Sequence, residues 1–183
     1  DDILSLITVS EGERSNSERI SGIYESIASL YYDNGYVYSV VYPDIKKEEG
    51  NKVSINFLIT EGVQTKVEEI RINGLTKTKP YVLERELAFK VGDIFSRSAF
   101  IQSQQNMYNT SLLKNISASL YPGKTEDGVI CEFNVEEGNQ MELQFGATFG
   151  ATELNGFPVS GFLSLTNNNL GGTGRALSLS TEI

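Results

Sequence analysis

The residue types that most often carry enzymatic chemistry are scarce in this chain of 183 residues. It has no histidine and no tryptophan, and Cys131 is its only cysteine. Metal sites built on His and Cys, disulfides within the chain, and His-based or Cys–His nucleophilic centres are therefore excluded. We expect no cofactor, no metal and no enzymatic activity, and we interpret Cys131 as a small buried hydrophobe in an alternating strand.

Two other patterns resemble reactive sites. Glu48-Glu49 and Glu136-Glu137 are paired acids of the kind used in acid–base catalysis, but both pairs stand beside turns at strand ends, where solvated charge is usual. The run Gly171-Gly172-Thr173-Gly174 resembles a phosphate cradle. It lacks the Gly-Lys-Ser/Thr ending and leads into a strand instead of a helix, so we interpret it as a turn between strands.

The distribution of charge indicates the domain organisation. The net charge is −9 and no basic stripe is visible, so we expect no nucleic-acid partner. Residues 1–62 carry 11 acids and 5 bases, residues 63–138 carry 10 acids and 9 bases, and the glycine-rich residues 139–183 carry only Glu142, Glu153, Glu182 and Arg175. This composition shift predicts a boundary near Gly138. The N-terminus does not resemble a signal peptide, and no apolar run of about 18 residues predicts a transmembrane helix.

A repeat of about 78 residues organises the first 138 positions. Each copy reads as a helix, a strand ending in Tyr-Pro, an acidic turn with glycine, an alternating strand and a closing Glu-Gly. Tyr42-Pro43, Gly50 and Glu61-Gly62 of the first copy match Tyr121-Pro122, Gly128 and Glu137-Gly138 of the second. The repeat predicts two small modules with the same fold.

The second copy predicts the element order β-α-α-β-β. Thr78 is expected to cap a helix with Pro80 in its first turn, running to about Phe89. Ser96 is expected to cap a second helix that runs to about Tyr108. Alternating residues predict strands over 67–72, 115–121 and 129–136.

The first copy lacks an opening strand. Residues 1–8 match the first helix, and Ser17 is expected to cap the second. That helix has one apolar face, formed by Ile20, Ile23, Ile27, Leu30 and Tyr31. Strands are predicted over 37–42 and 52–60, with an unpaired sheet edge beside 52–60. We therefore expect the sequence to be cut from a longer chain, at its front and at its back.

The tail alternates as membrane-crossing strands do. Met141, Leu143, Phe145, Ala147, Phe149 and Ala151 alternate with polar residues and glycine, over about the 9–11 residues that a tilted strand needs to cross a bilayer. The pattern returns over 159–165 and 177–183. A soluble sheet with one face on a core gives the same alternation, but the near absence of charge and of a following helix favours lipid. Three strands cannot close a barrel, so we interpret them as the start of one.

These features together resemble one family. Tandem β-α-α-β-β modules ending in Glu-Gly, followed by strands with Asn169-Leu170-Gly171-Gly172-Thr173-Gly174, are similar to the BamA-type outer-membrane protein assembly factors with their polypeptide-transport-associated (POTRA) repeats. Residues 1–62 resemble the penultimate POTRA module, 63–138 the last, and 139–183 the first three barrel strands. The family usually has a Gly-aromatic pair after the second helix, as in Gly35-Tyr36, where the second copy has Ser111-Leu112-Leu113.

The resemblance implies a protein of the bacterial outer membrane whose POTRA modules lie in the periplasm. It implies unfolded outer-membrane β-barrel proteins, accessory assembly lipoproteins and outer-membrane lipid as partners. It also implies that the first barrel strand forms one side of a lateral gate through which clients are inserted. Two alternatives are a two-partner-secretion-type exporter of the same superfamily and a soluble periplasmic protein-binding module.

The strand after the helices of each module is a candidate client-binding site. Such a strand should lie at a sheet edge, where its unpaired N–H and C=O groups can pair with an extended client of any sequence. The alternative is that Tyr38, Val40 and Tyr42 pack against the neighbouring module. The candidate residues are Val37, Tyr38, Ser39, Val40, Val41 and Tyr42 in the first copy and Ile116, Ser117, Ala118, Ser119, Leu120 and Tyr121 in the second.

The first strand of the tail is the candidate gate strand. Glycine weakens a strand, so Gly146 and Gly150 would lower the free energy needed to unzip it. The alternative is that these glycines only make room inside the barrel. The candidate gate residues are Met141, Leu143, Phe145, Gly146, Phe149 and Gly150.

Overall fold

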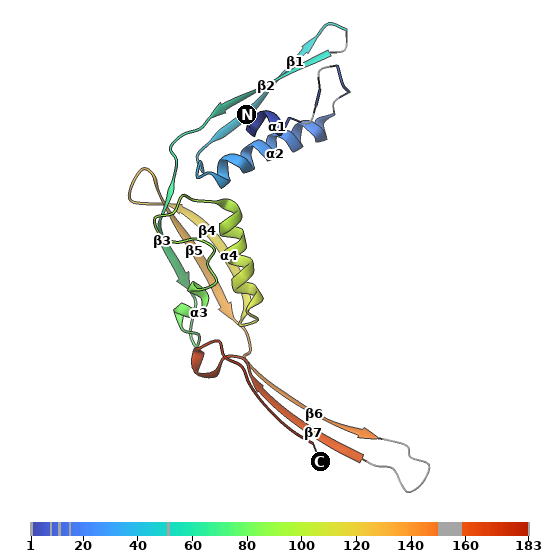
Figure 1. Cartoon of the computed structure of the whole chain (residues 1–183), viewed down its shortest axis with the longest axis vertical. Coiled ribbons are helices and arrows are strands. Elements are labelled where there is room, and N and C mark those ends of the chain that lie inside the picture. The colour runs from blue at the N-terminus through green and yellow to red at the C-terminus, as the bar shows by residue number, and fades with distance from the viewer. Residues whose placement is uncertain are drawn as a thin grey trace. The chain divides into compact units, whose positions relative to one another are not determined.

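The computed structural model describes residues 2–7, 9–10, 12–14, 16–50, 52–149 and 159–182. Its fold is α+β, as the sequence predicts, and its strands form three sheets with the orders β1-β2, β3-β5-β4 and β6-β7-β8 (Figure 1). Contacts divide the chain into two compact units. One comprises Asp1–Arg71, Ala88–Gln102 and Ser119–Glu132, and the other Ile72–Leu87, Ser103–Ala118 and Phe133–Ile183.

The N-terminal elements form a helix-covered hairpin. They are α1 (Asp2–Ser5), α2 (Ser17–Asp33), β1 (Val40–Glu48) and β2 (Lys52–Thr60). Ile23, Ile27 and Tyr31 lie on the predicted apolar face of α2 and pack with Val41 of β1 in one hydrophobic core. Burial of this face accounts for the helix, because tertiary packing contributes more to helix stability than intrinsic propensity does.

Two helix boundaries in this part differ from the prediction. Asn16, and not Ser17, caps α2, because its Oδ1 accepts the N–H of Arg19 at 2.9 Å. Ser17 is the first helical residue. Helix α1 is shorter than the predicted 1–8, since the N–H groups of Leu6 and Ile7 donate to carbonyls only three residues back, in turn geometry.

Strand β1 starts later and ends later than expected. The prediction of a strand from Val37 is wrong, because the N–H of Ser39 donates to the carbonyl of Tyr36 at 3.1 Å and closes a turn there. Its predicted end at Tyr42 is also wrong, because β1 continues through Pro43 to Glu48. Proline is tolerated in this strand because a sheet edge does not need every N–H for pairing. Strand β2 has the predicted bounds and pairs with β1 from Val40↔Thr60 to Glu48↔Lys52.

The central elements follow the predicted order β-α-α-β-β. They are β3 (Lys66–Asn73), α3 (Pro80–Glu84), α4 (Arg97–Asn109), β4 (Leu113–Pro122) and β5 (Gly128–Glu137). Ser96 caps α4 as expected, since its Oγ accepts the N–H of Ala99 at 3.3 Å. Strand β5 is central in its sheet and β4 is at an edge. Cys131 of β5 is buried as expected, and burial raises the pKa of its thiol to about 12.

The N-cap and the C-terminal end of helix α3 both differ from the prediction. Thr78 does not cap it, because Lys79 occupies the N-cap position without a side-chain hydrogen bond. Pro80 is in the first turn, as predicted. The helix ends at Glu84 instead of near Phe89, because the N–H groups of Glu86 and Leu87 donate to carbonyls three residues back.

The C-terminal sheet consists of β6 (Met141–Phe149), β7 (Val159–Asn167) and β8 (Leu177–Glu182). Its strands are antiparallel, with Leu143↔Leu165 and Leu165↔Leu179 among the paired residues. A short 3₁₀ helix, η1 (Leu170–Gly172), stands in the turn between β7 and β8, so the glycine run is a turn as expected. Among the described residues, no helix is long and apolar enough to cross a membrane.

Candidate client-binding edges and gate strand

The free edge of β4 can be assigned residue by residue. The N–H of Gly123 donates to the carbonyl of Gly128 at 2.8 Å, where the β4–β5 hairpin closes. Hydrogen bonds alternate sides along an antiparallel strand, so Tyr121 and Ser119 direct their backbone groups toward β5. Ala118 and Leu120 direct theirs the other way, toward an edge that pairs with no strand in the described part of the chain. The two residues present backbone groups to which an added strand can bind.

Ile116 belongs to the same edge, but its backbone groups already have partners. Its N–H donates to Oδ1 of Asn115 at 2.9 Å, and its carbonyl accepts Nε2 of Gln104 from α4 at 3.2 Å. Side chains thus satisfy the backbone at one end of the edge. Such covering is one way in which folded proteins limit unwanted strand pairing.

The first two residues of β1 on the face opposite the buried Val41 are apolar and exposed. Val40 and Tyr42 are 60% and 62% exposed, whereas Val41 between them is buried in the core. Leu58 of β2 stands opposite Tyr42 and is also exposed. Tyr38 is half-exposed in the turn before the strand. Tyr38, Val40 and Tyr42 are thus exposed within the described part of the chain, and whether they bind clients or pack against a neighbouring module stays a prediction.

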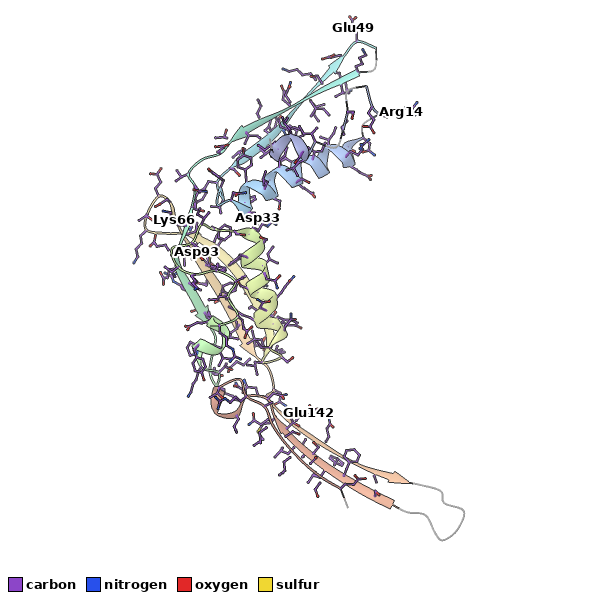
Figure 2. The ribbon with its side chains drawn as sticks, in the orientation of Figure 1. Arg14, Asp33, Glu49, Lys66, Asp93 and Glu142 are labelled. Carbon is purple, nitrogen blue, oxygen red and sulfur yellow. The ribbon has the colours of Figure 1, made fainter. Side chains whose placement is uncertain are left out.

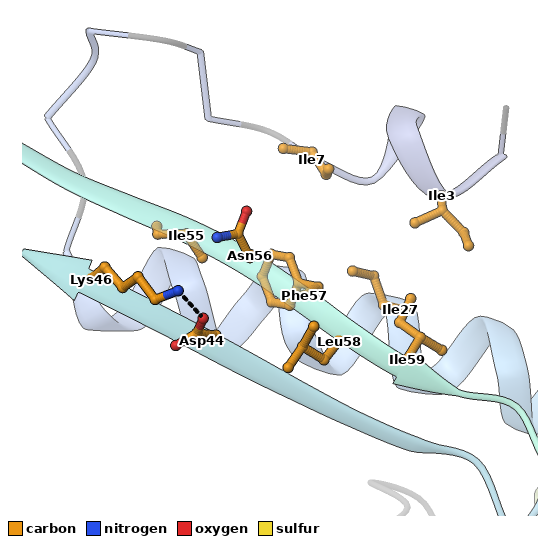
Figure 3. A pocket seen from close by; sticks show the side chains of 10 residues that line it. All are labelled: Ile3, Ile7, Ile27, Asp44, Lys46, Ile55, Asn56, Phe57, Leu58 and Ile59. Carbon is orange, nitrogen blue, oxygen red and sulfur yellow. Dashed lines mark ion pairs between the residues drawn. The ribbon is translucent and has the colours of Figure 1, made fainter.

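A groove of about 590 Å³ runs along β2 (Figure 3). Ile3 and Ile7 line it on one side and Ile55, Phe57 and Ile59 of β2 on the other. Asp44 and Lys46 form an ion pair of 3.1 Å in its wall. By the repeat, β2 corresponds to β5, whose second edge is occupied by β3. In the repeat, β2 therefore occupies the position of the central strand β5, and the groove lies against it.

The candidate gate strand β6 presents an apolar stripe. Met141, Leu143 and Phe145 are 56%, 60% and 78% exposed, which is unusual for side chains of this size. The stripe continues across the sheet through their cross-strand neighbours, the exposed Leu163, Leu165, Leu177 and Leu179. Phe149 ends β6, and Gly150 lies outside the described residues. A sheet with one such face is suited to contact with hydrocarbon.

Gly146 has a specific partner on the opposite face of the sheet. It pairs with Phe162 of β7, and a Cβ at Gly146 would stand 2.5 Å from Cε1 of the Phe162 ring. The ring therefore occupies the space that a side chain at 146 would need. This contact favours the interpretation that Gly146 makes room, over the interpretation that it weakens the strand.

Glu137 is not the solvated charge that its position in an acidic pair predicts. Its carboxylate accepts the N–H groups of Thr76, Lys77 and Thr78 at 3.0, 2.8 and 2.6 Å, and also the Thr76 hydroxyl. Partial burial by itself raises the pKa of Glu137, but the hydrogen bonds from Thr76, Thr78 and Lys77 outweigh it and hold this pKa at about 2. Its neighbour Glu136 pairs with Lys114 at 2.9 Å in an exposed ion pair, as solvated charge would.

Three buried polar residues meet where β5 leads into β6. Thr78 Oγ1 accepts Nδ2 of Asn169 at 2.8 Å and Nε2 of Gln140 at 3.3 Å. All three side chains are nearly inaccessible. The sequence pattern predicts a helix cap at Thr78 and only a turn at Asn169. The repeat contains no counterpart of the C-terminal sheet, so it carries no signal for this junction.

The geometry defines a class of protein: tandem α+β modules with open sheet edges, joined to a sheet with an exposed apolar stripe. A family model, POTRA (surface antigen variable number repeat), matches residues 1–62 and 65–138. The chain belongs to the POTRA family. That assignment rests on most of the chain and agrees with the order of elements in each module.

Individual proteins with similar sequences and structures show which members of the family the chain resembles. The chain is 32% identical over 162 residues to a Treponema pallidum (strain Nichols) protein described as an outer membrane protein assembly factor, covering 87% of this chain and 19% of that one. It is 25% identical to outer membrane protein assembly factor BamA of Nitratidesulfovibrio vulgaris, covering 84% and 19%. The crystal structure of BamA from Haemophilus ducreyi lacking POTRA domains 1–3 superposes with a TM-score of 0.86 at 26% identity, covering 100% of this chain and 34% of that one.

The resemblance to BamA-type assembly factors is thereby confirmed, as is the α+β fold of POTRA modules. The chain spans about a fifth of the length of the curated relatives it matches. These relatives are named for assembly and not for catalysis. No cluster of His, Cys, Asp and Glu that could hold a metal occurs among the described residues.

Proposed function

We propose that this chain is part of the core subunit of an outer-membrane β-barrel assembly machinery. Residues 1–62 and 63–138 act as its penultimate and last POTRA modules in the periplasm, and 139–183 supply the first three barrel strands. The named relatives are assembly factors, and the Haemophilus ducreyi protein aligns along the whole chain. The partners are unfolded outer-membrane proteins, accessory lipoproteins and outer-membrane lipid.

Clients bind by adding a strand to a module's sheet. The observation that carries this step is the free edge of β4, where Ala118 and Leu120 offer backbone groups that β5 does not use. Pairing through the backbone is independent of client sequence, which suits a machine with many β-rich clients. The exposed Val40, Tyr42 and Leu58 add an apolar surface on which client side chains can lie.

The gate strand β6 then passes the client into the membrane. Its exposed Met141, Leu143 and Phe145 face lipid, and its backbone pairs with β7 on one side. In lipid every strand backbone must be paired, so the other edge of β6 pairs with a further strand or with a client. Exchange of one for the other inserts the client without exposing unpaired backbone to hydrocarbon.

The decisive experiment is depletion of the full-length parent protein, with all outer-membrane β-barrels quantified by mass spectrometry. A broad fall across unrelated barrels is the expected result. Normal barrel levels with one secreted protein missing would contradict the proposal and support the exporter. A separate measurement is phase partitioning of the isolated segment 139–183. If the segment stays in the aqueous phase and does not enter detergent, the alternative of a soluble periplasmic binding module is supported.

The client edge has its own test in the full-length protein. Ala118→Pro removes an N–H that faces the free edge and leaves the β5 side of the ladder intact. We expect crosslinking of unfolded clients to β4 to fall several-fold, whereas the Ala118→Ser control keeps the N–H and the yield. Equal yields in the two variants would contradict client pairing at this edge.

A further inference from the structure

The turn between β7 and β8 is built around the side chain of Asn169. Its Oδ1 accepts the N–H of Gly174 at 2.7 Å, and the N–H of Leu170 donates to the carbonyl of Arg175 at 2.8 Å. These bonds fix the amide plane of Asn169. Its Nδ2 is thereby directed at Thr78 Oγ1, 2.8 Å away. The turn therefore holds Nδ2 of Asn169 in the orientation in which it donates to the loop that precedes α3.

Glycines give this turn its close fit to the same loop. The N–H of Lys79 donates to the carbonyl of Gly172 at 2.9 Å. A Cβ at Gly172 would overlap the carbonyl oxygen of Lys77, and one at Gly174 would stand 2.8 Å from Cγ1 of Val82. Gly171, by contrast, faces open space. Only some glycines of the run are required by the contact.

Gln140 joins the same cluster from the other side. It is the residue directly before β6, its Nε2 donates to Thr78 Oγ1 at 3.3 Å, and its carbonyl accepts the N–H of Asn168 at 2.8 Å. Thr78, Gln140 and Asn169 are only 4–6% exposed. Polar groups buried to this extent need their partners, because an unsatisfied one is costly.

We infer that Thr78 is a positioning residue for β6, and that its hydroxyl latches the start of that strand and the β7–β8 turn to the loop before α3. The latch makes the loop of residues 76–79, the first residues of β6 and the turn move together. Strand β6 then separates first at its C-terminal end, far from Gln140. A movement of α3 also moves the start of the strand. The inference rests on the proposed function only where β6 is called a gate.

The test is hydrogen–deuterium exchange on the full-length protein in detergent or nanodiscs. Thr78→Val keeps the shape of the side chain and removes its hydroxyl, so amides of residues 141–144 and of Asn168 should exchange about fivefold faster. Thr78→Ser should restore slow exchange. Thr76→Val is the matched control, because it also removes a hydroxyl bound to Glu137 but leaves Asn169 and Gln140 untouched. Equal exchange in Thr76→Val and Thr78→Val would overturn the latch.

A second pair of variants keeps the test decisive if Thr78→Val does not fold. Gly171 and Gly172 both have positive φ, of 63° and 74°, a conformation that asparagine tolerates. Gly172→Asn should speed exchange at residues 141–144, because its Cβ overlaps Lys77, whereas Gly171→Asn should not. Identical exchange in the two variants would contradict the inference. Neither measurement depends on client assembly, so its outcome is separate from that of the depletion experiment.

Discussion

The carboxylate of Asp33, which lies at the C-terminal end of α2 (Figure 2), accepts the backbone N–H of Ser98 in the first turn of α4 at 2.7 Å. The same Oδ1 is 3.3 Å from Oγ of Ser96, which caps α4 locally. Asp33 of α2 thus caps the N-terminus of α4, in addition to the local cap from Ser96. Arg97 adds a second link, with its guanidinium 5.6 Å from the centre of the Tyr32 ring.

Removing this carboxylate should destabilise α4. Asp33→Ala takes away an acceptor at a helix N-terminus, where a negative charge also interacts favourably with the helix dipole, and we expect a loss of about 1 kcal/mol. Asp33→Asn keeps an acceptor and should lose less. Urea denaturation measures the free energy of unfolding, with Glu25→Ala on the exposed side of α2 as the control. A loss no larger than that of the control would show that Ser96 alone caps the helix.

Ser111 stands where the repeat has Gly35, and its backbone explains what the family's glycine does there. Ser111 has φ of 59°, in the left-handed region that disfavours residues with a Cβ. We expect Ser111→Gly to raise stability by about 0.5 kcal/mol, since relief of strain exceeds the added freedom of the unfolded chain. Thermal unfolding measures it, and Ser117→Gly in the exposed part of β4 should lower the melting temperature. A lower melting temperature for Ser111→Gly would refute the strain argument.

The elements were largely predictable from sequence, because alternation and the repeat report which side chains are buried. Strand β2 has its predicted bounds, and the apolar face of α2 is the face that packs. The predictions were wrong where backbone hydrogen bonds determine the end of an element. The two examples are the turn before Val40 and the early end of α3. Local propensity does not report the tertiary contacts that settle such ends.

The candidate sites were predictable in kind but not in detail. That β4 is an edge strand follows from the order of elements, but the capture of Ile116 by Gln104 depends on how α4 lies over the sheet. The roles of Asp33 and Thr78 were missed, because each contacts residues more than sixty positions away. A pattern read within a window of a dozen residues carries no trace of such pairs.

The hydrogen bonds at Glu137 predict a loss of stability in acid. Its pKa is lowered from 4.5 to about 2 in the folded chain, so its contribution is fully present above pH 4.5 and is lost as the pH falls toward 2. Glu137→Gln should flatten the fall in melting temperature over this window. Glu136→Gln should leave it in place, because the ion pair of Glu136 with Lys114 is exposed and contributes little to stability. Parallel curves for wild type and Glu137→Gln would contradict the assignment.

The contact between Gly146 and Phe162 separates the two interpretations of glycine in β6. If Gly146 makes room for the ring, Gly146→Ala should destabilise the full-length protein in detergent by about 1 kcal/mol and should be nearly neutral in a Phe162→Ala background. If Gly146 instead weakens the strand, alanine should stabilise it in both backgrounds. A double-mutant cycle in thermal unfolding distinguishes the outcomes, and Gly161→Ala, which faces open space, is the control.

Gln104 should act as a brake on client pairing at β4. Its Nε2 occupies the carbonyl of Ile116, so a client strand gains that acceptor only when Gln104 turns away. Gln104→Leu should therefore raise the crosslinking yield of unfolded clients to β4 by up to about fivefold, the effect of one added hydrogen bond. Gln105→Leu makes the same change on the adjacent exposed residue and should leave the yield unchanged. A yield that rises equally in both variants would attribute the gain to added hydrophobicity and not to the freed carbonyl.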